Sequence, residues 1–408
     1  MLIGMQGYSY KHGLEKTMRR LGIVNNTCAY LIWLFCFICT SFVDAGEIKV
    51  GMSTALDGPA KALGQGVKLG VETYFNKVNA SGGVNGNTLS LVAKNDGYEP
   101  KKAAVNMREL ADNPDILAVI GNVGTPTAIV TVPIANEKKI LLFGAFTGAG
   151  VLRKTPPERY VMNYRASYAE ETSAMIEGLL KSGIKPEEIA FFTQNDGYGD
   201  AGYNGAIAAL KKKGYADADS LAHGRYPRNS LNVEEGLSDI LDADVEPRAI
   251  IMVGAYNPCA TFIELAKEEL PDTLFLNVSF VGSVPLLKKL GKHAENVIVT
   301  QVVPHYNDDH SGIKEYRQAL KEFSPEAAPG FVSLEGYIAA KIFVEGLKKT
   351  QGKGNREDVI NALQSIGTIN LGIGSDISFS STKHQGSNTV WPTIIKNGEY
   401  VPLQWEQL

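Results

Sequence analysis

The chain has 408 residues, of which 44% are hydrophobic and 21% are charged, and its formal net charge is −4. This composition is typical of a folded protein, and it excludes a disordered chain, a collagen-like repeat and a membrane protein with several spans. A slightly acidic chain gives no electrostatic reason to expect nucleic acid or an anionic membrane as a partner. The length exceeds the roughly 250–300 residues at which one hydrophobic core usually divides, so we expect more than one core.

The start of the chain resembles a secretion signal. Residues 29–42 are mostly apolar and uncharged, and two arginines precede them. Because about 20 apolar residues are needed to span a bilayer, this shorter run favours a signal peptide over 1–45, cut after Ala45. Translation from Met18 instead of Met1 would give a signal of ordinary length. The remaining chain is therefore expected to be exported, to the periplasm or another extracytoplasmic space.

Cysteine usage argues against a disulfide framework. Cys28, Cys36 and Cys39 fall in the apolar signal segment, and Cys259 is the one cysteine in the rest of the chain. The folded part therefore cannot depend on internal disulfides.

From Glu47 onward, short apolar runs that end in Gly, Asn or Asp alternate with amphipathic stretches. The expected strands are 48–53, 89–96, 116–121, 140–144, 189–196, 249–255, 274–279 and 297–303. The expected helices include 67–78, 101–111, 170–182, 201–213 and 258–269. Continuous apolar strands belong to parallel sheets that are covered on both faces. Because the alternation restarts after Arg165, we predict an α/β protein with two doubly wound, Rossmann-like lobes.

Two strand-to-helix joints resemble each other. In both, a strand runs through a short loop into a helix with Pro in its first turn, as Pro126 and Pro258. Thr125 and Asn257 are predicted to be the N-caps of these helices. Helix starts at the carboxyl edge of a sheet are suited to binding anions. The joints are therefore either a ligand site or simply well-capped helices.

A GxGxxG pattern over 197–202 is the strongest sign of an enzyme, because it follows a strand and opens a helix. Asp196 and Asp200 bracket the loop and would repel a diphosphate, and Tyr198 crowds the approach. A secreted dinucleotide enzyme therefore remains only as an alternative, to be tested by NAD binding.

No other pattern indicates catalysis or a metal. The run 305–310 gathers His and Asp residues, but its spacing matches no common metal site and it is interpreted as a solvated loop. No paired catalytic residues are found, so we expect no catalytic residue, no metal and no cofactor.

Two tyrosines follow strands of the second half. Tyr198 and Tyr256 are each expected to face the space between the lobes. Either one could simply pack in the core, but together they suggest a wall against a small ligand.

Several stretches together resemble a known family. They include IKVGMSTALDGPAKALGQG, NASGGVNG, VIGNVGTPT, FFTQNDGYG and SLEGYIAA. The chain is similar to type I periplasmic binding proteins, in the leucine/isoleucine/valine-binding branch that serves ABC transporters, over essentially all of 47–408. The resemblance implies two lobes that close like a clamshell around a ligand.

The resemblance also implies where the lobes divide. Three crossings are expected near 164–167, 301–305 and 372–379. Lobe 1 would then comprise 46–165 plus 304–372, and lobe 2 would comprise 166–303 plus 373–408.

Ligand contacts follow from the same resemblance. The residues that it assigns to the ligand are Thr125, Ala145, Thr147, Tyr198, Tyr256 and Ser279. Branched-chain amino acid binders hold the ligand ammonium with an acidic residue near the position of Ser279, where this sequence has no carboxylate. Because an unpaired buried ammonium is costly, either another acidic residue, such as Asp57 or Asp196, takes that role, or the ligand lacks an α-amine.

The function implied is that of a solute-binding protein of an ABC importer, not of an enzyme. It would bind an amino acid or a related small carboxylate and present it to an ABC permease in the inner membrane. The protein is expected to act as a monomer. The alternative is the same fold acting as a ligand-sensing receptor for a signalling partner.

Overall fold

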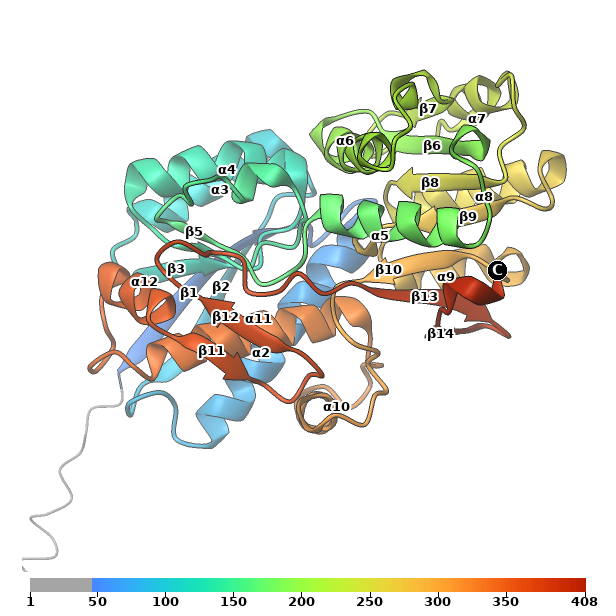
Figure 1. Cartoon of the computed structure of the whole chain (residues 1–408). Coiled ribbons are helices and arrows are strands. Elements are labelled where there is room, and N and C mark those ends of the chain that lie inside the picture. The colour runs from blue at the N-terminus through green and yellow to red at the C-terminus, as the bar shows by residue number, and fades with distance from the viewer. Residues whose placement is uncertain (1–45) are drawn as a thin grey trace, which may run out of the picture. The chain divides into compact units, whose positions relative to one another are not determined.

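Two large β-sheets organise residues 46–408, the part of the chain that this computed structural model describes (Figure 1). The predicted signal peptide over 1–45, with its cleavage after Ala45, lies outside the described residues. Among the described helices, none combines the length and the apolar character that a membrane span requires. The two-lobed α/β fold predicted from the sequence is confirmed.

The first lobe is built on a parallel sheet with the order β2-β1-β3-β4-β5. Its strands are β1 (Glu47–Thr54), β2 (Thr88–Asn95), β3 (Ile116–Ile120), β4 (Leu142–Phe143) and β5 (Val161–Met162). Its helices are α2 (Lys61–Ala80), α3 (Pro100–Asp112), α4 (Thr125–Lys138), α10 (Ser311–Phe323), α11 (Phe331–Leu347) and α12 (Arg356–Gln364). Because helices cover both faces, β3 is apolar throughout and β1 is buried along most of its length.

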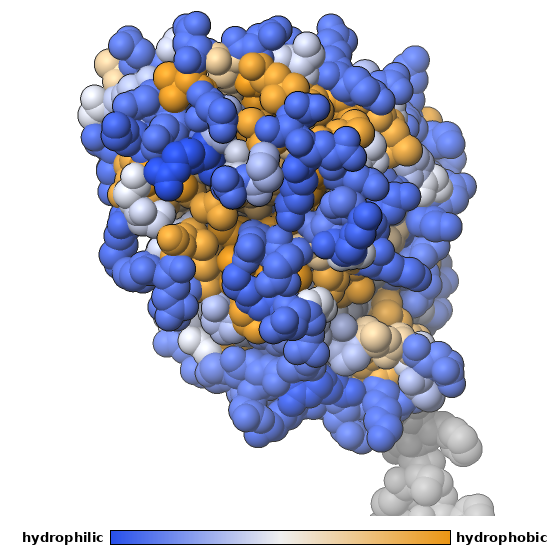
Figure 2. All heavy atoms as spheres, turned by 90° about the vertical axis from the view of Figure 1, so that its right-hand side faces the viewer, coloured by the Kyte–Doolittle hydropathy of each residue, from blue (hydrophilic) through white to orange (hydrophobic). Residues whose placement is uncertain are grey.

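The second lobe has a larger sheet with the order β14-β13-β10-β9-β8-β6-β7. Its strands are β6 (Ile189–Gln194), β7 (His223–Tyr226), β8 (Ala249–Val253), β9 (Leu274–Asn277), β10 (Ile298–Gln301), β13 (Trp391–Lys396) and β14 (Glu399–Pro402). Its helices are α5 (Tyr168–Lys181), α6 (Gly197–Lys212), α7 (Glu234–Leu241), α8 (Tyr256–Glu269) and α9 (Ser283–Leu290). Figure 2 shows the molecule from the side of this lobe, where hydrophobic residues lie among hydrophilic ones.

All eight predicted strands are present, as β1–β4, β6 and β8–β10. The strands that the sequence did not predict lie mostly at the sheet edges. β7 carries His223 and Arg225 on an edge, and β13 and β14 add an antiparallel hairpin at the other edge. Edge strands can hold polar side chains, so they lack the continuous apolar run that reveals a central strand.

Three segments connect the lobes. The first follows β5 and the second follows β10. The third was expected over 372–379, but that range contains β12 (Asp376–Phe379), which pairs with β11 (Gly367–Asn370). The ring of Phe379 lies 6.2 Å from that of Phe143, between centroids, so this hairpin packs on the first lobe. The chain therefore stays on the first lobe at least as far as Phe379, seven residues beyond the expected boundary at 372.

The first and third crossings are hydrogen-bonded to each other. The N–H of Asn163 donates to the carbonyl of His384 at 2.7 Å, and the N–H of Gly386 donates back to the carbonyl of Asn163 at 2.8 Å. The hydroxyl of Tyr164 also reaches the carbonyl of Val302 in the second crossing, at 3.3 Å. The three crossings thus form one connected hinge.

Helices α2 and α11 make the closest helix contact of the first lobe. A Cβ on Gly70 would lie 2.0 Å from the carbonyl oxygen of Ser333, and one on Gly336 would lie 2.4 Å from that of Val67. The two helix backbones therefore touch, and only glycine leaves room for this approach. On its other side α11 packs at the carboxyl end of β4, where Ala339 Cβ lies 3.0 Å from the position of a Cβ on Gly144.

We expect Gly70→Ala to destabilise the protein by about 1–3 kcal/mol, because the added methyl group has no space. In an open helix the same change would be stabilising by up to about 1 kcal/mol. Denaturant unfolding measures the difference, with Gly150→Ala as control, since a Cβ there meets nothing within 4 Å. Equal stability of both variants would contradict the close contact.

Candidate functional site

The start of α4 lies at the carboxyl edge of the first sheet, where β3 ends. Thr125 was predicted to be the N-cap, but the N-cap is Gly124, with φ at 104°, and no side chain caps this helix. Likewise α8 begins at Tyr256, so Asn257 lies inside the helix and donates to the carbonyl of Pro59 at 3.4 Å. Both cap predictions were wrong, because each helix starts earlier than expected. The hydroxyl of Thr125 is consequently free for other contacts.

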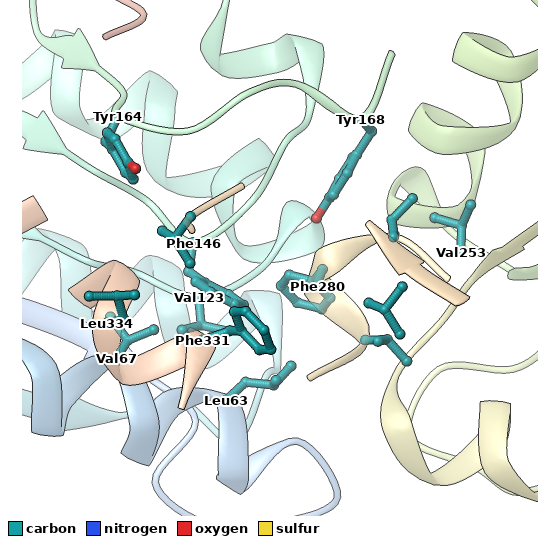
Figure 3. Packing of buried hydrophobic residues seen from close by; sticks show 14 of the residues in the cluster. Leu63, Val67, Val123, Phe146, Tyr164, Tyr168, Val253, Phe280, Phe331 and Leu334 are labelled. Atoms are coloured by element: carbon teal, nitrogen blue, oxygen red, sulfur yellow. The ribbon is translucent and has the colours of Figure 1, made fainter. Parts of the chain in front are cut away.

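Three buried hydroxyl groups meet at this helix start. Thr125 Oγ1 lies 2.7 Å from Thr147 Oγ1, and the Thr147 hydroxyl is 3.2 Å from that of Tyr168. Thr125 and Thr147 belong to the first lobe, while Tyr168 opens α5 of the second. We call these residues the hydroxyl cluster. In Figure 3 the hydroxyl of Tyr168 points toward the space between Phe146 and Phe280.

The sequence had not indicated Tyr168. Tyr168 follows the first crossing directly, after the N-cap Ser167. Its position next to a predicted crossing was the one feature of the sequence that could have indicated a site residue. The backbone of Ala145, which was predicted as a contact, accepts a hydrogen bond from the Thr147 N–H at 2.8 Å. Burial raises the pKa of Tyr168 to about 12, so its hydroxyl is a neutral donor at physiological pH.

Aromatic side chains from both lobes close the site. Phe280, from the loop after β9, packs against Tyr98 and Phe146 of the first lobe, with ring centroids 5.9 and 5.5 Å away. Its ring also lies 4.6 Å from that of Tyr198. Tyr198 is fully buried, and its hydroxyl donates to the carbonyl of Gly254 at 3.1 Å. The second predicted tyrosine, Tyr256, faces the backbone of Ala62 across the lobes.

A polar cluster joins the lobes near their far edges. Glu99 follows β2, an edge strand of the first sheet, and Arg228 and Asn229 follow β7, an edge strand of the second. Arg228 Nη2 donates to Glu99 Oε2 at 2.9 Å, and Asn229 Nδ2 donates to Glu99 Oε1 at 2.7 Å. We call these three residues the interlobe latch. Gln194 Nε2 adds a hydrogen bond to the hydroxyl of Tyr98 at 3.2 Å.

A cavity of about 160 Å³ lies between the lobes near the latch. Pro59 and Ala60 line it from the first lobe, and Gln194, Tyr226 and Asn257 line it from the second. A wider hollow of about 890 Å³ surrounds Glu47 and Ile116 at the amino ends of the first sheet. Ligands of open α/β sheets bind at the carboxyl ends of the strands. The smaller cavity, and not the wider hollow, therefore lies on the side of the sheets where a ligand is expected.

The two predicted ammonium partners differ in their surroundings. Asp57 is exposed. Asp196 is the N-cap of α6, accepts hydrogen bonds from Tyr198 N at 2.9 Å and Gln194 Nε2 at 2.8 Å, and lies 3.5 Å from Arg228 Nη1. Neither is therefore both buried and unengaged.

The glycines of the GxGxxG pattern have a packing explanation. A Cβ on Gly199 would lie 2.0 Å from the carbonyl oxygen of Gln194, and one on Gly202 would lie 2.5 Å from the side chain of Val253. The helix start that a diphosphate would occupy is capped by the carboxylate of Asp196. In the described residues, moreover, no group of three His, Cys, Asp or Glu side chains could hold a metal.

A buried charge network lies beside the hydroxyl cluster, and the sequence did not predict it. Arg165 in the first crossing donates to Glu171 Oε1 at 3.2 Å and to the hydroxyl of Ser279. Glu171 also accepts from the N–H of Ser279 at 2.7 Å and from Thr300 Oγ1 at 2.7 Å. Ser279, which was predicted to contact the ligand, is thus held in place by hydrogen bonds to the carboxylate of Glu171.

Glu335 of α11 completes this network from the first lobe, with Oε1 3.5 Å from Arg165 Nη1. Burial raises the pKa of Glu335 to about 7, against the opposing effect of Arg165. The guanidinium of Arg165 also lies over the ring of Phe146, 5.0 Å from its centroid. Charges from both lobes and from the hinge therefore meet next to the aromatic wall.

Comparisons with known proteins agree with this architecture. Residues 47–399 match the family described as periplasmic binding protein. The structure of a possible leucine/isoleucine/valine-binding protein from Rhodopirellula baltica SH 1 is 46% identical with a TM-score of 0.87, and the match covers 90% of this chain and 99% of that one. A substrate-binding periplasmic protein from Ralstonia solanacearum is 26% identical with a TM-score of 0.79, covering 87% of this chain and 100% of that one. The Leu/Ile/Val-binding protein homolog 2 of Brucella abortus (strain 2308) is 26% identical, and the match covers 92% of this chain and 96% of that protein.

We expect Glu99→Gln to raise the ratio of open to closed molecules about two- to fivefold, because an exposed ion pair stabilises by ~0.5–1 kcal/mol. Energy transfer between dyes at Val105→Cys and Leu241→Cys, exposed positions on α3 and α7, reports the lobe distance. The native Cys259 is fully buried, and burial raises its thiol pKa, so it should not react with the dyes.

Glu109→Gln is the matched control, because Glu109 pairs with Lys94 within the first lobe. An unchanged distance distribution in Glu99→Gln, or an equal change in the control, would contradict the role of the latch.

Proposed function

Because this chain belongs to the periplasmic binding protein family, we propose that it binds an amino acid or a related small carboxylate between its lobes for uptake by an ABC importer. Several relatives carry names that specify leucine, isoleucine and valine as ligands. The importer's permease in the inner membrane would be the partner. Export from the cytoplasm, required by such a role, is consistent with the signal peptide predicted from the sequence.

The observation that carries the proposal is the hydroxyl cluster at the start of α4. The first N–H groups of a helix have no partner within it and lie at the positive end of the helix dipole. Thr125 and Thr147 share one hydrogen bond between them. If an entering carboxylate replaced that bond, each of the two hydroxyls could donate to it. Hydrogen bonds to a charged group each contribute about 1.5–3 kcal/mol. Together these groups make a site for the carboxylate of a small solute.

Closure of the lobes would complete the site. The first lobe supplies Thr125 and Thr147, and the second supplies Tyr168, Tyr198 and Phe280. A ligand touching both sets binds the closed form more tightly than the open form, and this difference shifts the equilibrium toward closure. We propose that the three crossings, near 164–167, 302–310 and 380–390, act as the hinge.

A thermal-shift screen tests the function directly. The purified protein would be melted with each of the twenty amino acids and with matched carboxylates lacking the amine. A ligand that binds only the native state stabilises it by about 2.7 kcal/mol at a hundredfold excess over Kd. A rise in melting temperature with at least one of these compounds supports the proposal, and no rise with any of them contradicts it.

We expect Thr125→Val to weaken binding of a carboxylate ligand about tenfold, because one charge-assisted hydrogen bond is lost. Without ligand, the variant should lose no more than about 0.5–1.5 kcal/mol of stability, the net contribution of the hydrogen bond between Thr125 and Thr147. Isothermal titration calorimetry measures the affinity.

Thr131→Val is the control on the same helix. Thr131 is also fully buried, and its hydroxyl has no hydrogen-bond partner among the described residues. This variant should bind with the affinity of the unmodified protein. If both variants bind equally well, Thr125 does not contact the ligand.

A further inference from the structure

A solute with a protonated amine would bring a positive charge between the lobes, and a nearby carboxylate would have to neutralise it. Carboxylates that flank the cleft include Asp57, Asp96, Glu99, Asp196, Glu171 and Glu335. Most of them are already engaged. Asp96 accepts from the hydroxyl of Ser53 at 2.7 Å and the N–H of Tyr98 at 2.8 Å, and the contacts of Glu99, Asp196 and Glu171 are described above. Asp57 is exposed to solvent.

Glu335 is different, because it is buried and lacks a hydrogen bond. Only 5% of the residue is exposed. Within residues 46–408, the sole polar contact of its carboxylate is the ion pair with Arg165 Nη1 at 3.5 Å, a distance too long for a good hydrogen bond. A buried carboxylate in this state is costly unless it takes up a proton or a cation.

The register of α11 places Glu335 at the carboxyl edge of the first sheet. Phe343 packs on Phe143 of β4, with ring centroids 6.0 Å apart, and the Cβ of Ala339 lies 3.0 Å from the position of a Cβ on Gly144. Each step of four residues moves about one helical turn along the strand direction. Glu335, one turn before Ala339, therefore lies beyond the end of β4, on the side of Phe146 and Thr147.

Arg165 and Tyr168 connect this carboxylate to the hydroxyl cluster. The guanidinium of Arg165 lies 5.8 Å from the ring centroid of Tyr168, whose hydroxyl belongs to the cluster. Arg165 Nε and Nη1 have no hydrogen-bond partner in the described residues. The donors of nearby Arg153 are used by Gln385 and by the carbonyls of three residues. The hydrogen-bond donors and acceptors that lack partners in this region therefore belong to Arg165 and Glu335.

We propose that Glu335 binds the protonated amine of the ligand, so that the solute is an α-amino acid held by its carboxylate at the hydroxyl cluster and by its amine at α11. This inference rests on the proposed function and narrows it to solutes with an amine. The three N–H donors of an ammonium group would give the Glu335 oxygens the hydrogen bonds that they lack.

If Glu335 binds the amine, the affinity for the ligand should depend on pH. The groups that face Glu335 are Arg165 and Tyr164 in the crossing, Glu171 on α5 and Arg153. The two guanidinium groups stay charged and Tyr164 stays neutral between pH 6 and 8. Because burial raises the pKa of Glu335 to about 7, most molecules are protonated there at pH 6 and ionised at pH 8. Only the ionised form attracts an ammonium, so affinity should rise with pH.

The experiment compares matched ligand pairs that differ only in the amine. The pairs are L-leucine and 4-methylpentanoate, L-valine and 3-methylbutanoate, L-phenylalanine and 3-phenylpropanoate, and L-glutamate and glutarate. For the pair that binds, calorimetry should give the amino acid an affinity about tenfold or more above that of its partner. The amino acid's affinity should also rise about tenfold from pH 6 to pH 8, while that of the amine-free acid should not.

Glu335→Gln should remove both the preference for the amine and the rise with pH. Glu345→Gln is the control on the same helix, because Glu345 is partly exposed and pairs with Lys348. If Glu335 only supports the fold, its variant would weaken both members of a pair equally and leave their ratio unchanged, which would overturn the inference.

The outcomes separate this inference from the function on which it rests. Binding of the amine-free acids alone, or a pH-independent affinity for the amino acid, refutes the role of Glu335 but leaves carboxylate binding intact. No rise in melting temperature with any compound of the thermal-shift screen would refute both.

Discussion

The buried guanidinium of Arg165 is the group on which the arrangement of the two lobes depends. It lies in the first crossing, contacts Glu171 of the second lobe and Glu335 of the first, and is 1% exposed. Leaving one partner of a buried ion pair unmatched typically costs about 3–5 kcal/mol. Separating the lobes at this point would therefore be costly, and we expect any relative motion of the lobes to turn about it.

The contacts between the lobes that lie far from the hinge are weaker than those of Arg165. Glu99, Arg228 and Asn229 are polar and partly exposed, so each of their interactions is weak and exchanges readily with water. A binding protein needs this contrast, because it must hold its two halves together permanently and yet open and close at low cost. The aromatic ring of Phe280 adds apolar contact across the lobes at an intermediate position.

The sequence predicted the layers of the fold well, and the site in part. Continuous apolar runs identified the central strands, since burial on both faces leaves little choice of residue. Thr125 and Thr147 were grouped correctly in space, while the cap assigned to Thr125 was wrong because the left-handed Gly124 starts the helix one residue earlier. Whether these two residues touch a ligand stays a prediction.

The charge network could not be predicted from sequence patterns. Arg165, Glu171, Ser279 and Glu335 are separated by up to 170 positions, and no local spacing relates them. They meet only because the chain crosses between the lobes and α11 packs closely on α2 through Gly70 and Gly336. A buried Glu in a mostly apolar helix gives no sign of its partner until the tertiary fold is known.

The interlobe latch lies far from the hinge in both sheets, so a small rotation about the hinge moves the latch residues by a large distance. Glu99 follows β2, four strands from β5, which leads into the first crossing, and Arg228 follows β7, four strands from β10, which leads into the second. At a spacing of about 4.8 Å per strand, the latch lies ~19 Å from the hinge strands. A rotation of about 10° would then shift the latch atoms by ~3 Å, enough to break every hydrogen bond there, while groups near Arg165 barely move. A small rotation at the hinge would thus remove all the hydrogen bonds of the latch together.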